Sequence, residues 1–118
     1  MIKIALLLLL GAWVCSYAQE APCRVKTDDL AGHYVGDCLK GKAHGQGKAI
    51  GRDTYEGAFE KGYPQGKGTY TWMNGDYYEG YFEKGERQGA GKMVFASVKE
   101  DSVQEGRWKN DRWVGKEE

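Results

Sequence analysis

Large apolar residues alternate with polar ones along two near-identical stretches of this chain. Residues 55–62 read Tyr-Glu-Gly-Ala-Phe-Glu-Lys-Gly, and residues 78–85 read Tyr-Glu-Gly-Tyr-Phe-Glu-Lys-Gly. In a strand, residues i, i+2 and i+4 share one face, so Tyr55, Gly57 and Phe59 lie together and the glutamates face the other way. Alternation with period two, in segments rich in aromatic and β-branched residues, predicts strands rather than helices.

The stretch belongs to a repeat that recurs four times in register. The glycine that ends each Tyr-Xaa-Gly triplet, with Gln104 in place of Tyr in the fourth copy, gives the marks Gly36, Gly57, Gly80 and Gly106, at spacings of 21, 23 and 26 residues. A second set of glycines follows each mark at a fixed distance: Gly45, Gly47, Gly66, Gly68, Gly89, Gly91 and Gly115. Repeats of this length bury their apolar faces by stacking on their neighbours, so we expect a stacked array.

Turn residues divide each repeat into two strands. Lys-Gly at 61–62 and at 84–85 tolerates positive φ between the arms, and Asn-Gly at 74–75 is the strongest short-range hairpin signal, placed where one repeat passes into the next. The predicted fold is all-β: an elongated single-layer antiparallel meander of about four stacked hairpins, with seven or eight strands. One face carries rings and glycines, and the other is charged and rich in threonine.

The ring face is the first candidate binding surface. We predict that glycines on this face leave slots for rings of the neighbouring strand, because a glycine inside a strand otherwise weakens it by roughly 0.5 to 1 kcal/mol. Most of the rings should form the core, with their ends left partly open to a partner. The ring face comprises Tyr34, Tyr55, Phe59, Tyr70, Trp72, Tyr78, Phe82, Phe95 and Trp108.

The motif Tyr-Xaa-Gly-Xaa-Phe, a Lys-Gly turn and then Gly-Xaa-Gly resembles the MORN (membrane occupation and recognition nexus) repeat. The match is best at 55–77 and 78–95 and recognisable at 34–54, and residues 34–118 are assigned to one MORN-type domain. The resemblance implies stacked hairpins without catalytic residues, found in scaffolding and membrane-associated proteins. The fourth repeat departs from the pattern at Gln104, Asp111 and Glu117, which predicts a terminal cap.

The first 18 residues predict export. Lys3 precedes an apolar run from Ile4 to Val14, and small residues lead to Ala18, after which we expect signal-peptide cleavage. A transmembrane anchor would need roughly 20 apolar residues, and a lipoprotein signal at Cys15 is a further alternative. We therefore expect a periplasmic or extracellular protein, peripheral at a membrane in one alternative. Residues 19–33 are predicted to cover the first edge strand.

The two cysteines that follow the predicted cleavage site are expected to pair. Cys23 and Cys38 would close a loop of about 15 residues, which contributes on the order of 3 kcal/mol in the chain-entropy treatment. Two free thiols are the alternative. In the first repeat Cys38 occupies the position of Phe59, so the bridge replaces a ring there.

Charge and composition disfavour several functions. Cleavage removes one of 17 basic residues and none of 17 acidic ones, so the remaining chain lacks the positive footprint of a nucleic-acid binder. No cofactor or metal site is predicted: we expect His33 and His44 to be exposed, the latter in a turn. Glu56, Glu79 and Glu105 are interpreted as part of a cross-strand charge ladder rather than as a hydrolytic acid pair.

The predicted function is a non-enzymatic interaction or assembly scaffold that binds a protein partner or self-associates. A second candidate surface, the turn lysines Lys40, Lys61 and Lys84, would lie along one rim and supports the alternative of a peripheral module for anionic phospholipids. A small secreted hydrolase is the least favoured hypothesis, because the sequence shows no nucleophile motif, no set of metal ligands and no recessed pair of acids.

Overall fold

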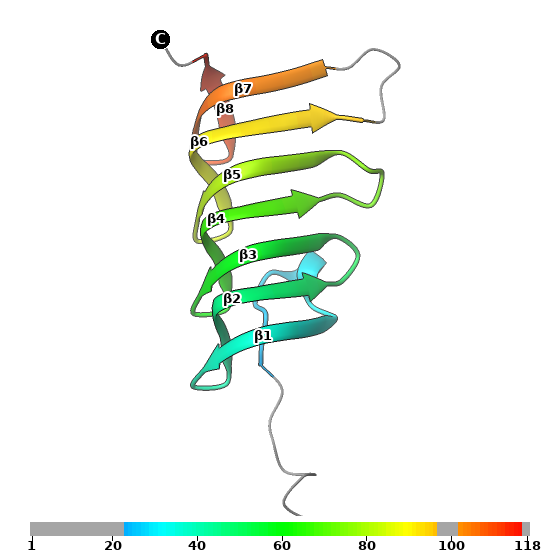
Figure 1. Ribbon diagram of the computed structural model, residues 1–118, viewed down its shortest axis with the longest axis vertical. Coiled ribbons are helices and arrows are strands. Elements are labelled where there is room, and N and C mark those ends of the chain that lie inside the picture. The colour runs from blue at the N-terminus through cyan, green and yellow to red at the C-terminus, as the bar shows by residue number, and fades with distance from the viewer. Residues whose placement is uncertain (1–22, 97–101, 117–118) are drawn as a thin grey trace, which may run out of the picture.

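The computed structural model describes residues 23–96 and 102–116, so the predicted signal peptide, residues 1–18, lies outside the described part. Eight strands form one sheet in the order β1-β2-β3-β4-β5-β6-β7-β8, and all neighbours are antiparallel (Figure 1). This confirms the predicted all-β meander of four hairpins. The strands are β1 (His33–Leu39), β2 (Lys42–Ile50), β3 (Thr54–Glu60), β4 (Tyr63–Thr71), β5 (Tyr77–Glu83), β6 (Glu86–Phe95), β7 (Ser102–Lys109) and β8 (Arg112–Gly115), preceded by the 3-10 helix η1 (Asp28–Leu30).

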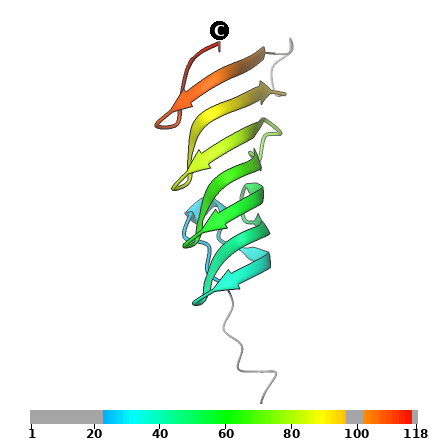
Figure 2. The same ribbon diagram turned by 60° about the vertical axis from the view of Figure 1, so that its left-hand side comes forward.

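Each hairpin closes with a two-residue turn in which both residues have positive φ. Lys61 and Gly62 have φ of 53° and 89°, and the turns at residues 40–41 and 84–85 repeat this geometry. Two-residue loops of this kind match the right-handed twist of the flanking strands. In the fourth hairpin Asn110 and Asp111 take the same conformation, because short polar side chains tolerate it. The four hairpins stack one above another (Figure 2).

A continuous row of glycines crosses the sheet. Register pairs Gly57 with Gly47 on one side and Gly68 on the other, and the row runs through seven strands as Gly36, Gly47, Gly57, Gly68, Gly80, Gly91 and Gly106. A Cβ on Gly57 would lie 2.4 Å from the Cα of Gly68. At Gly57, as at Gly36 and Gly80, the backbone of the next strand therefore leaves no room for a side chain.

The first glycine of each Gly-Xaa-Gly pair has a different role from the second. Gly66 has φ of 91° and lies where the β3–β4 register shifts, between the pairs Gly57–Gly68 and Phe59–Pro64. It carries a β-bulge rather than a slot for a ring, and a Cβ there would meet the Cβ of Ala58 at 3.4 Å. Period-two alternation alone would place Gly66 beside Gly68 on the ring face, and the bulge overrides that prediction. Gly45 and Gly89 have the same conformation.

The turns form their own hydrogen-bond ladder along the stack. The N–H of Gly62 donates to the carbonyl of Ala43 at 2.9 Å, and Gly85 donates to Pro64 at the same distance. The Oε1 atom of Gln65 accepts from the N–H of Lys84 at 2.9 Å, and Gln88 accepts likewise from Asn110. Each of the last three turns is thus bonded to the preceding repeat in addition to the strand pairing, so the turn edge of the array is a regular surface.

The core occupies the ring face. Its buried apolar residues come from six of the strands, β2 to β7, and from η1, which contributes the fully buried Leu30. Phe82 lies near the middle of the core, 5 % exposed, with its ring 5.1 Å from that of Tyr55 and 5.0 Å from that of Tyr78.

Replacing this central ring tests the core assignment. Phe82→Ala should lower the free energy of unfolding by about 3 to 5 kcal/mol, because it removes a buried ring from a packed position. Lys61→Ala, on the exposed turn, should change it by less than about 0.5 kcal/mol. Urea denaturation of the two variants measures both values, and similar small shifts for the pair would contradict the core assignment.

Candidate functional site

The ring face is built from one motif, in which a tyrosine ring lies over a glycine of the next strand. A Cβ on Gly68 would come within 2.3 Å of Cζ of Tyr55, and Gly91 and Gly47 are covered in the same way by Tyr78 and Tyr34. The tyrosine hydroxyl reaches the backbone of its own strand: Tyr55 donates to the carbonyl of Ala58 at 2.8 Å. Tyr78 donates to Tyr81 at 2.9 Å, and Tyr34 to Asp37 at 2.6 Å. The sequence predicted the ring in the slot but not the partner of its hydroxyl.

The rings join into a chain of edge-to-face contacts along the array. Successive centroids lie 5.0 to 5.3 Å apart with interplanar angles of 81 to 88°, the arrangement that the quadrupoles of aromatic rings favour. The order of the chain is Tyr34, Phe59, Tyr55, Phe82, Tyr78, Trp108. Of the remaining predicted ring residues, Tyr70 contacts Trp72 with ring centroids 4.6 Å apart and planes tilted by 48°, while Phe95 packs at the margin of the core.

The repeated motif matches a known family. The family profile described as "MORN repeat" matches residues 34–53, 55–77 and 78–97, which together cover more than half of the chain. This chain belongs to the MORN repeat family. The hairpin β7–β8 lies beyond the matched segments but continues their pairing and glycine row. None of the curated proteins gives a significant match to the whole chain.

A buried carboxylate links two of the MORN hairpins and was missed from the sequence. Asp53, 2 % exposed, accepts the hydroxyl of Tyr70 at 2.6 Å and the N–H of Met73 at 3.0 Å. Its own N–H donates to the carbonyl of Asp29 at 3.0 Å, which ties η1 to the same point. The recurrence of an aspartate two residues before Tyr55 and Tyr78 was the available signal.

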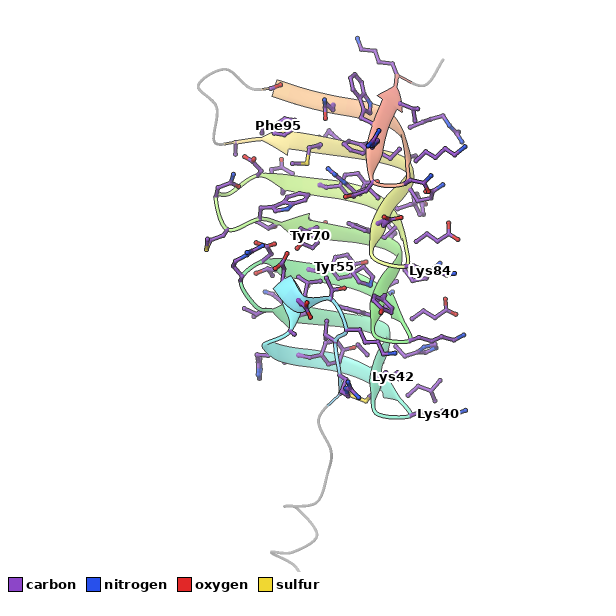
Figure 3. All side chains as sticks on the ribbon, turned by 180° about the vertical axis from the view of Figure 1, so that it is seen from behind. Lys40, Lys42, Tyr55, Tyr70, Lys84 and Phe95 are labelled. Carbon is purple, nitrogen blue, oxygen red and sulfur yellow. A yellow bond between two sulfur atoms is a disulfide. The ribbon has the colours of Figure 1, made fainter. Side chains whose placement is uncertain are left out.

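The segment before β1 covers the ring face of the first two repeats. A disulfide joins Cys23 to Cys38, with the Cα atoms 5.8 Å apart, as predicted. From there the chain crosses the sheet to η1, which lies in front of the lower strands in Figure 3. Arg52 pairs with Asp29 at 2.9 Å and fastens η1 to the β2–β3 connection. Residues 19–33 were predicted to lie over the edge strand β1. The described part of this segment extends well past that strand.

Among residues 23–96 and 102–116, no such segment covers the third and fourth repeats. Phe95 and Trp113 are only partly buried there, as is Trp72 at the end of the second repeat, and Arg87 lies over the ring of Trp72. Among the described residues, the indole Nε1 of Trp113 is a buried side-chain donor without a hydrogen-bond partner. This half of the ring face combines apolar surface with an unsatisfied donor, which marks it as the candidate site.

Arg87 occupies a position that the preceding repeats fill with Pro64 and Ala43. Its guanidinium carbon lies 4.5 Å from the ring centroid of Trp108 and 5.5 Å from that of Trp72. Its Nε donates to Oδ1 of Asp111 at 2.6 Å and its Nη2 to the carbonyl of Asp111 at 2.8 Å. The guanidinium of Arg87 is therefore held in place by Asp111, and its flat surface forms part of the ring face.

The predicted lysine row lies on the turn edge. Lys40 and Lys84 extend from that edge in Figure 3, and Lys61 is exposed in the turn between them. His33 is exposed, whereas His44 lies half-buried in β2 rather than in a turn, because the two-residue turn ends at Gly41. Among residues 23–96 and 102–116, no cluster of three or more His, Cys, Asp or Glu side chains could hold a metal ion.

The face opposite the rings carries the carboxylates. Glu56 pairs with Lys48, and Glu79 and Glu105 both pair with Lys92 across the strands. Lys92 thus stands between Glu79 and Glu105 in the register, as in a charge ladder, whereas Thr69 stands between Glu56 and Glu79. Within the described part of the chain there is no helix of the length and apolarity that a membrane crossing needs.

Burial of the tyrosines makes stability sensitive to alkali. Burial raises the pKa of Tyr78 to about 12 from its usual 10.0 and also raises that of Tyr55. Above about pH 10 the unfolded chain loses these protons while the folded chain keeps them, so the free energy of unfolding should fall as pH rises. Below about pH 10 the contribution is complete. Replacing Tyr78 by Phe should make the fall shallower.

Urea midpoints measured between about pH 8 and pH 11 test this expectation. Tyr81→Phe, at an exposed position, is the matched control and should keep the slope of the parent protein. Parallel pH profiles for the parent and Tyr78→Phe would contradict it. The lost hydroxyl bond adds a constant cost of about 1 kcal/mol, which does not change the slope.

Proposed function

We propose that this MORN repeat protein acts after export as a non-enzymatic module that binds an extended segment of a partner protein across the ring face of β5–β8. The observation that carries the proposal is the docking of the chain's own segment, residues 23–32, on the same face of the first two repeats. MORN repeats are in general non-enzymatic, and they are consistent with interaction modules. The disulfide favours an oxidising compartment and therefore export.

The bound segment shows how these repeats hold an extended chain. The N–H of Arg24 donates to the carbonyl of Gly41 at 2.8 Å, and the N–H of Lys26 donates to that of Gly62 at 2.8 Å. One segment thus uses the turn glycines of two successive repeats. Leu30 then inserts fully into the core and Val25 packs against it, so main-chain bonds supply the register and aliphatic side chains supply the apolar burial.

The uncovered half offers the matching chemistry. Trp72, Phe95 and Trp113 present partly exposed apolar surface, and aromatic residues of this kind are enriched among the energetic hot spots of interfaces. The expected partner is therefore an extended peptide with at least one large aliphatic side chain.

Panning of a displayed library of random peptides against the disulfide-bonded protein tests the proposal. Enriched peptides should carry aliphatic residues and should bind Trp113→Ala and Trp72→Ala at least about tenfold more weakly, as expected for a truncated hot spot. Met73→Ala removes an apolar side chain that is 74 % exposed on the β4–β5 connection, and it serves as control. It should leave binding unchanged.

Two results would contradict the proposed function. The first is the absence of any enriched peptide, and the second is binding that tolerates both tryptophan substitutions in variants whose unfolding midpoints match the parent protein. Sedimentation velocity of the same variants tests whether the partner is a second copy of the chain. In that case Trp113→Ala should abolish self-association through this face.

A further inference from the structure

Four cations converge at the turn edge of the first two repeats, at the opposite end of the array from the open ring face. Arg24 forms a parallel bridge with Lys42, its N–H donates to Gly41 at 2.8 Å, and its carbonyl accepts from Ala43 at 2.9 Å. Residues paired directly across a ladder point to the same side, so the side chains of Arg24 and Lys42 are neighbours. The segment outside the repeats thus adds a charge to the turn edge.

Lys26 adds another charge from the same segment. Its N–H donates to the carbonyl of Gly62, and its side chain passes over that glycine, with Cγ 2.9 Å from where a Cβ would stand. Lys61 is the adjacent turn residue. Three parts of the chain therefore contribute to the cluster: the N-terminal segment, the start of β2 and the β3–β4 turn. Figure 3 shows Lys42 beside Lys40 on this edge.

The cations of this cluster repel one another. The charged groups that act on Lys42 are Lys26, Arg24 and Lys61, and their repulsion, above all that of Lys26, lowers the pKa of Lys42. Within the described part of the chain, no carboxylate forms an ion pair with any of the four residues, whereas Arg52 and Arg87 pair with Asp29 and Asp111. Like charges held together in this way destabilise the fold by mutual repulsion. An anion bound among them would offset that repulsion.

We propose that Arg24, Lys26, Lys42 and Lys61 form a binding site for an anion that carries at least two neighbouring phosphate groups. Arginine offers a planar fork for two phosphate oxygens, and the three ammonium groups supply point charges around it. A single phosphate carries too little charge to face all four cations. The ligand is either a soluble oligophosphate or adjacent phosphate headgroups on a membrane surface.

The disulfide gives the site its fixed geometry. Cys23 directly precedes Arg24, and its bond to Cys38 ties this residue to the end of β1. Exposed lysines usually lose entropy when they are ordered around a ligand. Here the disulfide and the two turn carbonyls already fix the backbone of Arg24 and Lys26, so ligand binding has only their side chains left to order.

The test uses the disulfide-bonded protein with two probes at low salt. Titration calorimetry measures binding of tripolyphosphate, and flotation measures binding to vesicles of phosphatidylglycerol and phosphatidylcholine. The double variant Arg24→Gln/Lys26→Gln should weaken binding of the responsive probe by on the order of tenfold or more, as expected for two lost phosphate contacts. The control Lys84→Gln/Lys109→Gln makes the same change in net charge at exposed positions outside the cluster and should have less than about twofold effect.

The two probes separate the sources of phosphate. Loss of tripolyphosphate binding in the cluster variant supports a soluble ligand, and loss of vesicle binding alone supports a membrane surface. The proposal is overturned if the parent protein binds neither probe, or if the control variant weakens binding as much as the cluster variant. Neither outcome bears on peptide binding at the ring face, so the two proposals fail separately.

Chemical labelling gives an independent readout. The depressed pKa of Lys42 leaves more of its amine unprotonated than at an ordinary lysine, so an acylating reagent near neutral pH should modify Lys42 faster than Lys84. Tripolyphosphate or the vesicles should slow labelling of Lys26 and Lys42 and leave Lys84 unchanged. Equal protection at all three lysines would overturn the site.

Discussion

The contact between a tyrosine ring and a glycine of the adjacent strand is the constraint on which the rest of this structure depends. The ring of Tyr55 can lie flat across Gly68 only because no Cβ stands there, and its hydroxyl then reaches the carbonyl of Ala58. A register slip of one residue would move the ring to the other face and replace the glycine by a side chain. The motif therefore fixes the register of each hairpin, and the edge-to-face chain of rings follows from its repetition.

Most of the fold could be predicted because its signals are local and recur. The alternation around Tyr55 and Phe59, the Lys-Gly turns and the spaced glycines each specify strand, turn or close approach within a few residues. The missed features depend on contacts between distant parts of the chain. Asp53 meets Tyr70 and η1 only after two connections have folded together, and the cation cluster requires a segment outside the repeats to cross the turn edge. The separate role of Gly66 was missed because glycine occurs both at the bulge and at the regular strand positions, so residue type alone does not distinguish them.

The two ends of the array differ in chemistry although their backbones repeat. At the first end the chain's own segment buries Leu30 and brings Arg24 and Lys26 to the turn edge. At the other end the rings stay partly open around Arg87, whose charge is neutralised by Asp111. Identical repeats would give a uniform surface, so the non-repeated residues are what make the two ends of the array chemically different. Sequence reasoning that weighs only the repeat underestimates such differences.

The strictly sequential strand order sets a length scale. Each strand pairs only with its neighbours in sequence, so one added or deleted repeat would preserve every type of contact between hairpins. It would also change the separation of the two ends by about 10 Å, the width of two paired strands. The number of repeats therefore acts as a ruler: it determines how far apart the cation-rich end and the aromatic end are held, independently of what either end binds.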